Sequence, residues 1–182
     1  TSVSRGLGDV YKRQVFYPDY YGKNFILNDL THEGGLTAIR IEGPSNSVDQ
    51  RLGRLSKELG LLDQELSVLD NEQSNIFWSR TKNLEVFKKL ESNLLRIVLP
   101  ISETLQVIQK LKSYDIKYFV DWGGSLIWAA FETLNAKILS DIKDIVKKHQ
   151  GYITLIKIED DLKASADIFT IDPIKYKICL LY

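Results

Sequence analysis

The chain has 182 residues, a length typical of one domain, and 44% of them are hydrophobic, which is enough to form a core. Its 24 basic residues balance 24 acidic residues, so the charge gives no basis for binding nucleic acid or for a polybasic membrane anchor. No apolar run reaches the roughly 20 residues that a transmembrane helix needs, and a single cysteine excludes a disulfide framework.

The two ends of the chain resemble a translated sequencing-library adapter. Residues 9–14 and 179–182 can be encoded by opposite strands of one short DNA element. We therefore interpret residues 1–14 and 179–182 as adapter-derived and exclude them from the prediction of the fold. An ordinary glycine-rich arm is the alternative interpretation of the first segment. The only thiol, Cys179, lies in the second segment, so no redox role is assigned to it.

The next part of the chain divides into a linker and a domain. Residues 15–33 are aromatic and polar without clear periodicity, and we expect them to form a connecting segment. Residues 34–178 are expected to form the domain. Its first strand is predicted over residues 36–42, where apolar residues alternate before Gly43 and Pro44 end the strand.

Two helices are predicted in the following stretch, each from a start signal. Ser47 opens a Ser-x-x-Gln sequence of the capping-box form, and Gly60 is suited to the end of this helix. Asp70 opens a similar Asp-x-x-Gln sequence at the start of the second helix. A short strand is expected between them, over about residues 64–69.

The second half of the chain alternates strands and helices. Ser102 is a candidate N-cap for a helix with Leu105 on its inner face, and a later helix over residues 135–150 is expected to be capped by Gly151. This order favours an α+β fold in which an antiparallel sheet has its helices packed on one face. The four expected strands are residues 94–99, 116–120, 125–131 and 152–158.

No arrangement of residues indicates catalysis by this chain alone. Residues 15–178 contain no Gly-x-Gly-x-x-Gly sequence, and no serine lies in a Gly-x-Ser-x-Gly elbow. His32 and His149 are far apart and are interpreted as a loop residue and a helix C-terminal cation, so no metal site is expected. The acidic run over residues 159–161 is interpreted as a solvated loop.

Two short blocks carry the remaining signals. Arg96 lies within an apolar strand, where an unpaired cation is costly, so it either faces solvent or pairs with an anion such as Asp121 or a cofactor group. Trp122, Gly123 and Gly124 form an aromatic-glycine sequence whose simplest interpretation is a tight turn with positive φ. Stacking on a planar ring and packing in the core are both open for the three tryptophans, Trp78, Trp122 and Trp128.

These blocks belong to a set of five that resembles the C-terminal half of the FAD-binding subunit of bacterial glycolate oxidase, in the FAD-linked oxidase family. Two departures stand in the last block, where Tyr152 and Ile153 replace a usual glycine and histidine, and Leu95 stands where tryptophan is common. The five blocks, in the family's order, are residues 35–43 with the following helix, 77–78, 95–100, 121–124 and 151–155.

The resemblance implies a cap domain with ferredoxin-like elements that lies beside a bound FAD. It implies cofactor contacts at Arg96, Asp121, Trp122, Gly123 and Gly124, with most of the FAD held by a preceding half outside this sequence. In related catalytic flavoproteins the corresponding turn carries histidines that serve a metal and a hydroxy-acid substrate, and this turn has none. No catalytic residue is therefore assigned.

The implied protein is an auxiliary subunit of a complex that oxidises 2-hydroxy acids. Its partners would be a catalytic flavoprotein and an iron–sulfur subunit, in the cytoplasm or held at the inner membrane through the complex, and the fragment alone would be inactive. Two alternatives stay open. One is the cap of another FAD-linked oxidase, and the other is a non-enzymatic ferredoxin-like sensor or oligomerisation domain.

Overall fold

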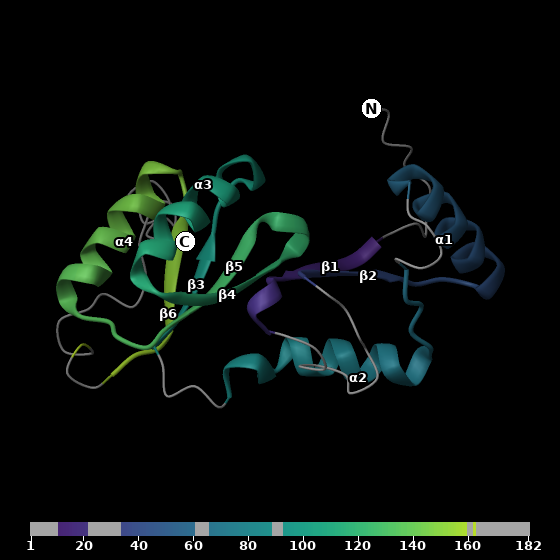
Figure 1. The fold of residues 1–182 in the computed structure, drawn as a ribbon, viewed down its shortest axis with the longest axis horizontal. Coiled ribbons are helices and arrows are strands. Elements are labelled where there is room, and N and C mark those ends of the chain that lie inside the picture. The colour runs from purple at the N-terminus through teal and green to yellow at the C-terminus, as the bar shows by residue number, and fades with distance from the viewer. Residues whose placement is uncertain (1–10, 22–33, 61–65, 89–92, 160–161, 163–182) are drawn as a thin grey trace, which may run out of the picture.

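The structure, a computed structural model, describes residues 11–21, 34–60, 66–88, 93–159 and 162. Within these ranges six strands form one sheet in the order β2-β1-β4-β5-β3-β6 (Figure 1). Every neighbouring pair of strands is antiparallel, so the expected α+β fold with an antiparallel sheet is confirmed. The strands are β1 (Tyr11–Tyr17), β2 (Leu36–Ile41), β3 (Asn93–Val98), β4 (Ile116–Asp121), β5 (Leu126–Phe131) and β6 (Tyr152–Lys157).

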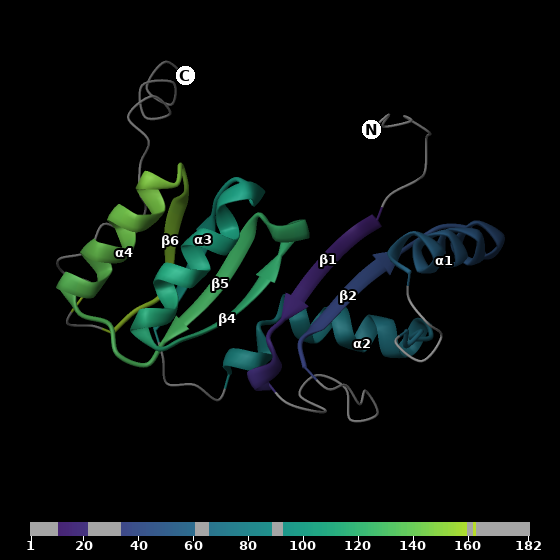
Figure 2. The same ribbon diagram turned by 45° about the horizontal axis from the view of Figure 1, so that its top comes forward.

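Helices cover both faces of this sheet, which corrects the expectation that they pack on one face. Tyr118 lies in a hydrophobic cluster with side chains of α3 and α4, whereas its neighbour Phe119 lies in a second cluster with Phe77 and Trp78 of α2. Successive strand residues point to opposite faces, so α2 packs against the face that α3 and α4 leave open (Figures 1 and 2). The helices are α1 (Ser45–Leu59), α2 (Asn71–Lys82), α3 (Ile101–Leu111) and α4 (Ala136–Lys148).

The sequence of β4 explains why helices pack on both faces of the sheet. The sequence of β4, Ile-Lys-Tyr-Phe-Val-Asp, is nearly continuous in large residues, and all of them except Lys117 are buried. A strand buried on both faces has this pattern, whereas a strand buried on one face alternates apolar and polar residues.

Single-turn helices complete the described elements. They are η1 (Asp19–Tyr21), η3 (Glu85–Phe87), η4 (Lys112–Tyr114) and η5 (Trp122–Gly124).

Strand β1 was missed at the sequence level because its first half was set aside. Residues 11–14, which resemble adapter sequence, pair with β2, and Phe16 pairs with Val120 of β4. Residues 15–17 complete the strand, so the connecting segment expected over residues 15–33 starts later. Residues 22–33 lie outside the described residues.

Two of the predicted helix signals are confirmed. Asp70 is the N-cap of α2, and it forms both hydrogen bonds of a capping box with Gln73, at 2.8 and 3.2 Å. Gly60 ends α1 in the left-handed conformation with φ 63°. These two signals are local, so the sequence alone is sufficient to place them.

Three other predictions about helix starts and a strand are wrong. Helices α1 and α3 begin directly after Pro44 and Pro100, so neither Ser47 nor Ser102 is an N-cap. The Ser47 hydroxyl instead accepts a hydrogen bond from Arg51 at 2.8 Å. No strand forms over residues 66–69, the described part of the segment expected to be a strand.

The predicted inner-face position of Leu105 and the predicted C-cap at Gly151 are also wrong. Leu105 is 65% exposed, because the buried side of α3 is formed by other residues. His149, not Gly151, is the C-cap of α4. A Cβ at Gly151 would lie 2.7 Å from Val146 and 3.0 Å from the Val98 carbonyl oxygen, so this glycine permits a close approach of the chain.

Candidate functional site

The turn between β4 and β5 holds Trp122 in an unusual backbone conformation. Its φ is 54°, and the next two residues, Gly123 and Gly124, have φ of 62° and 108°. A bulky residue rarely adopts positive φ, and such outliers gather at functional sites. A Cβ on Gly124 would lie 2.8 Å from the Ile101 side chain, so this position accepts only glycine without rearrangement. The tight turn with positive φ is therefore confirmed.

Side chains from both sides fix this turn. The Trp122 N–H donates to a carboxylate oxygen of Asp121 at 2.8 Å, and the Ser125 hydroxyl donates to the Trp122 carbonyl at 3.0 Å. The Thr104 hydroxyl of α3 donates to the Gly124 carbonyl. These contacts hold the indole of Trp122 outside the core, where it is 54% exposed.

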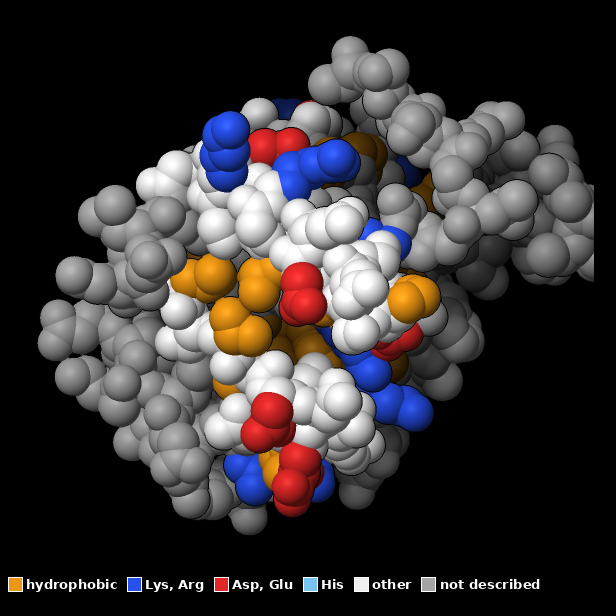
Figure 3. Space-filling view, turned by 90° about the vertical axis from the view of Figure 1, so that its right-hand side faces the viewer, with side chains coloured by type: hydrophobic (Ala, Val, Ile, Leu, Met, Phe, Trp, Pro, Cys, Tyr) orange, Lys and Arg blue, Asp and Glu red, His pale blue; other side chains and the backbone are white. Residues whose placement is uncertain are grey.

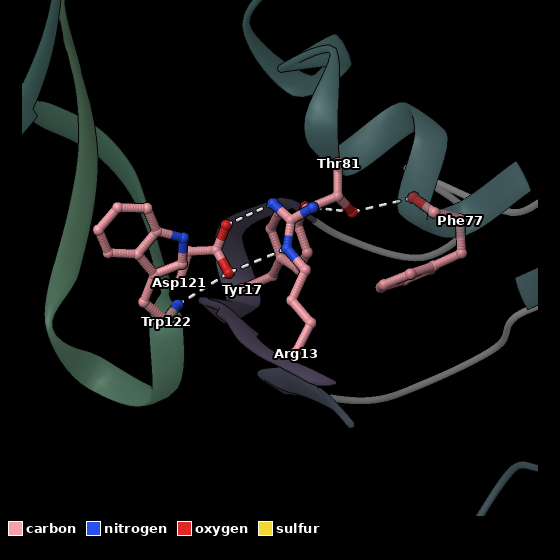
Figure 4. Close-up of polar contacts among 6 residues, drawn as sticks. All are labelled: Arg13, Tyr17, Phe77, Thr81, Asp121 and Trp122. Carbon is pink, nitrogen blue, oxygen red and sulfur yellow. Dashed lines mark hydrogen bonds and ion pairs between the residues drawn. The ribbon is translucent and has the colours of Figure 1, made fainter. Parts of the chain in front are cut away.

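Asp121 is buried and its charge is balanced by Arg13 of β1 (Figure 4). The Arg13 Nε donates to Oδ1 at 3.2 Å, and its Nη2 donates to Oδ2. The carboxyl side chain is only 1% exposed. The guanidinium carbon of Arg13 also lies 5.4 Å from the ring centroid of Trp78. Asp121 thus supports the turn and the sheet, and it does not pair with Arg96, which was one of the expected alternatives.

Arg96 instead lies over the exposed indole of Trp122. Its guanidinium carbon is 4.8 Å from the ring centroid, a geometry worth about 0.5–1 kcal/mol at an exposed site. Arg96 points to the same face of the sheet as its cross-strand neighbours Trp128 and Thr154, all three half-buried. No ion pair joins it to a carboxylate of the described residues. A half-buried cation without a carboxylate partner among the described residues is suited to bind an anion.

The other two tryptophans belong to the core. Trp78 is 5% exposed, and Trp128 stacks on Phe119 with ring centroids 6.5 Å apart. Both lie in or against the cluster between α2 and the sheet. Of the three tryptophans, Trp122 alone presents enough ring surface for stacking on a ligand.

A buried hydrogen-bond chain anchors α2 to β1 (Figure 4). The Tyr17 hydroxyl donates to Thr81 at 3.0 Å, and the Thr81 hydroxyl donates to the Phe77 carbonyl at 2.9 Å. Burial raises the pKa of Tyr17 far above its ordinary value. Tyr17 is therefore a structural group rather than an acid or base.

The residues described by the structure do not include a group for metal binding. No three His, Cys, Asp or Glu side chains of the described ranges gather in a metal-binding arrangement. His149 lies at the C-terminal end of α4 as expected, and it is 7% exposed. His32, Asp160 and Asp161 lie outside the described residues, and Glu159 is exposed as expected of a surface loop.

Arg13 is the site residue that the sequence analysis missed. A usable signal was present, because Arg13, Val15 and Tyr17 alternate with more polar or exposed neighbours in the pattern of a strand. Setting aside residues 1–14 removed that signal. Since Arg13 belongs to the adapter-like segment, we rest the functional proposal on Arg96 and Trp122.

No protein-family model and no curated protein matches the chain. The resemblance to FAD-linked oxidases therefore rests on the five sequence blocks. In the part of the chain that the structure describes, no helix is both long and apolar enough to cross a membrane.

Proposed function

We propose that the chain is a cap-domain fragment of the FAD-binding subunit of a glycolate-oxidase-like complex, which oxidises 2-hydroxy acids. The main support is the pairing of Arg96 with Trp122 on one face of the sheet, at 4.8 Å. FAD combines an anionic pyrophosphate with planar rings, and an arginine beside an exposed indole offers a partner to each of these chemical groups.

The residues of the site would divide the work of holding the cofactor. Arg96 would bind an anionic group, and the indole of Trp122 would stack on a ring. Asp121 would act indirectly, because its carboxylate accepts a hydrogen bond from the Trp122 N–H and so holds the turn in place. Gly123 and Gly124 would let the turn approach the cofactor closely. FAD, when bound, supplies the redox chemistry, and the protein positions and shields it.

The residue composition of the β4–β5 turn supports an auxiliary role for this chain. The sequence of the turn, Asp-Trp-Gly-Gly, has no imidazole to bind a metal or a hydroxy acid. The substrate would then be oxidised in a catalytic flavoprotein subunit, with an iron–sulfur subunit as a further partner. This complex would lie in the cytoplasm, or at the inner membrane through its other subunits.

A cap of another FAD-linked oxidase is an alternative with the same site. A non-enzymatic interaction domain is the second alternative, and α1 favours it. Val48, Leu52 and Leu55 share one side of α1 and are only half-buried, and Leu59 at the end of this helix is 55% exposed. Figure 3 shows hydrophobic side chains gathered on the side of the molecule where α1 and α2 lie in Figure 1. A partner or a second domain that covers this surface would fit an exposed apolar patch.

Sequencing of the DNA on both sides of this fragment separates the three possibilities. We expect an FAD-binding domain upstream in the same reading frame, with neighbouring genes for a catalytic flavoprotein and an iron–sulfur protein. An FAD-binding domain without those neighbours favours the cap of another FAD-linked oxidase. A complete reading frame that covers this region alone contradicts both flavoprotein proposals.

A binding measurement tests the division of FAD between the two halves. We expect the isolated chain to retain little FAD, because the proposed cap supplies few of the contacts. The measurement is flavin absorbance of the protein peak after gel filtration. Tight stoichiometric FAD in that peak contradicts the assignment of most contacts to a preceding half, and the Arg96→Gln variant then reports whether Arg96 contributes.

A further inference from the structure

We propose that Lys110 is a site of acylation by acyl thioesters, with His149 as the base that activates its amine. The two residues come from different helices, since Lys110 lies in the last turn of α3 and His149 is the C-cap of α4. They belong to the helical layer on the face of the sheet opposite to Arg96. The proposal is therefore independent of the FAD site.

Three side chains form a continuous hydrogen-bonded row. The Nζ of Lys110 lies 2.8 Å from Nε2 of His149, and Nδ1 of His149 lies 2.6 Å from a carboxylate oxygen of Glu103. An ammonium group has only donors, so Nε2 accepts from Lys110 and Nδ1–H donates to Glu103. In this assignment the base of the proposed reaction is the imidazole that carries its single proton on Nδ1, which leaves Nε2 free to accept a proton from Lys110.

The row has the order of a nucleophile, a base and a group that orients the base. Both distances lie within the hydrogen-bond range required of such groups. Burial holds the imidazole of His149 in place, because its side chain is only 8% exposed. The Glu103 side chain is 28% exposed. Lys110 is exposed, so its amine is accessible to a reagent from solution.

The chemistry needs no reactant beyond the thioester. The Lys110 ammonium passes one proton to Nε2 of His149, and the imidazolium, stabilised by Glu103, releases it to solvent. The neutral amine attacks the thioester carbonyl carbon, a C–N bond forms and the C–S bond breaks. The thiolate leaves with the bonding electron pair, and a second proton moves from Nζ through Nε2 to the thiolate. The products are an amide at Lys110, a free thiol and one proton in solution.

Lys112 provides an internal control for this proposal. It is exposed like Lys110 and lies just beyond the same helix, in η4. Among the residues that the structure describes, no hydrogen bond joins its amine to a histidine. A structural ion-pair cluster would give the two lysines similar acylation rates, whereas activation by a base accelerates Lys110 alone. The comparison within one protein sample removes differences in folding and reagent concentration.

The experiment treats the whole chain with acetyl coenzyme A at neutral pH and follows acetylation of each lysine by peptide mass spectrometry. We expect Lys110 to react about tenfold or more faster than Lys112, because general-base assistance accelerates proton-transfer reactions by at least that amount. Equal rates at the two lysines overturn the proposal without any variant.

Two variants test the roles of the other residues. In His149→Gln the rate at Lys110 should fall to that of Lys112, and in Glu103→Gln it should fall part of the way. Circular dichroism and the unchanged rate at Lys112 verify that each variant is folded. A rate at Lys110 that His149→Gln leaves unchanged also overturns the proposal, because the acceleration would then come from exposure rather than from the imidazole.

Discussion

The Arg13 guanidinium and the Asp121 carboxylate join two strands that are 108 positions apart in the sequence. Arg13 lies in β1 and Asp121 lies at the end of β4, so the ion pair ties the first strand to the centre of the sheet. The carboxylate also accepts from the Trp122 N–H at 2.8 Å. One buried side chain therefore links the sheet to the conformation of the β4–β5 turn.

Removal of the Asp121 carboxylate should destabilise the protein strongly. In Asp121→Ala the partly buried Arg13 loses its counter-ion and the Trp122 N–H loses its acceptor, so we expect a loss of about 3 kcal/mol in the free energy of unfolding. Asp121→Asn keeps an acceptor for the turn and should cost less. Urea unfolding followed by circular dichroism measures both effects.

An exposed ion pair of the same sheet serves as the control. Lys117 and Glu132 lie 3.4 Å apart with side chains that are 45% and 63% exposed. Glu132→Gln should change the free energy of unfolding by less than about 0.5 kcal/mol, as is usual for surface pairs. A similar small effect for Asp121→Ala would show that the Arg13 contact contributes little.

Gly124→Ala should destabilise the β4–β5 turn by about 1–3 kcal/mol, through its positive φ and through crowding against Ile101. The matched control is Gly53→Ala in α1, where a Cβ meets nothing within 4 Å. An alanine inside a helix is favoured over glycine, so Gly53→Ala should raise stability by up to about 1 kcal/mol. Thermal unfolding of both variants gives the comparison, and a neutral Gly124→Ala would contradict the steric argument.

Local signals predicted most of the fold. The strands β3, β4, β5 and β6 each coincide with an expected apolar stretch within one or two residues, and Asp70 with Gln73 correctly predicted the start of α2. These features depend on residues a few positions apart. The start of α1 was placed late because Ser47 offers a capping pattern, whereas the helix begins directly after Pro44.

Long-range contacts were not predictable in the same way. Arg96 was correctly identified as an unusual charge in an apolar strand, but its neighbour is the Trp122 ring and not Asp121. The partner of Asp121 is Arg13, which lies in the segment over residues 1–14 that was interpreted as adapter-derived. The face on which α2 packs was also missed, because the hydrophobic pattern of β4 shows that both faces are buried without showing which helix covers each face.

Tyr17 makes a prediction about alkaline stability. Burial raises the pKa of its phenol far above the ordinary value near 10, so the native chain keeps this proton as the pH rises and the unfolded chain loses it. The contribution of Tyr17 to stability is thus fully present below that ordinary value and decreases above it. Tyr17→Phe should remove a slope of up to about 1.4 kcal/mol per pH unit in this range.

Unfolding by urea at a series of alkaline pH values measures this slope. Thr81→Val is the matched variant, because it removes the hydroxyl to which Tyr17 donates but leaves the phenol buried. The slope should persist in Thr81→Val and diminish in Tyr17→Phe. Equal slopes in the wild-type chain and in Tyr17→Phe would mean that the phenol ionises alike in both states.

Arg96 should attract anions to the indole of Trp122. Iodide quenches tryptophan fluorescence on contact. Trp122 is 54% exposed, whereas Trp128 is half-buried and Trp78 is 5% exposed, so Trp122 should contribute the largest share of the quenching. At low ionic strength, where surface charges are weakly screened, Arg96→Gln should lower the iodide quenching constant by about one third to one half. Quenching by acrylamide, which is neutral, should stay nearly unchanged.

Two controls separate the charge of Arg96 from general effects. Lys117→Gln removes a cation elsewhere on β4 and should leave iodide quenching as in the wild-type chain, and Trp122→Phe should abolish most of it. If Arg96→Gln leaves iodide quenching unchanged, the guanidinium does not concentrate anions at this indole. The proposed contact of Arg96 with an anionic group of FAD would then lose its physical basis, because that contact requires a cation available to a ligand.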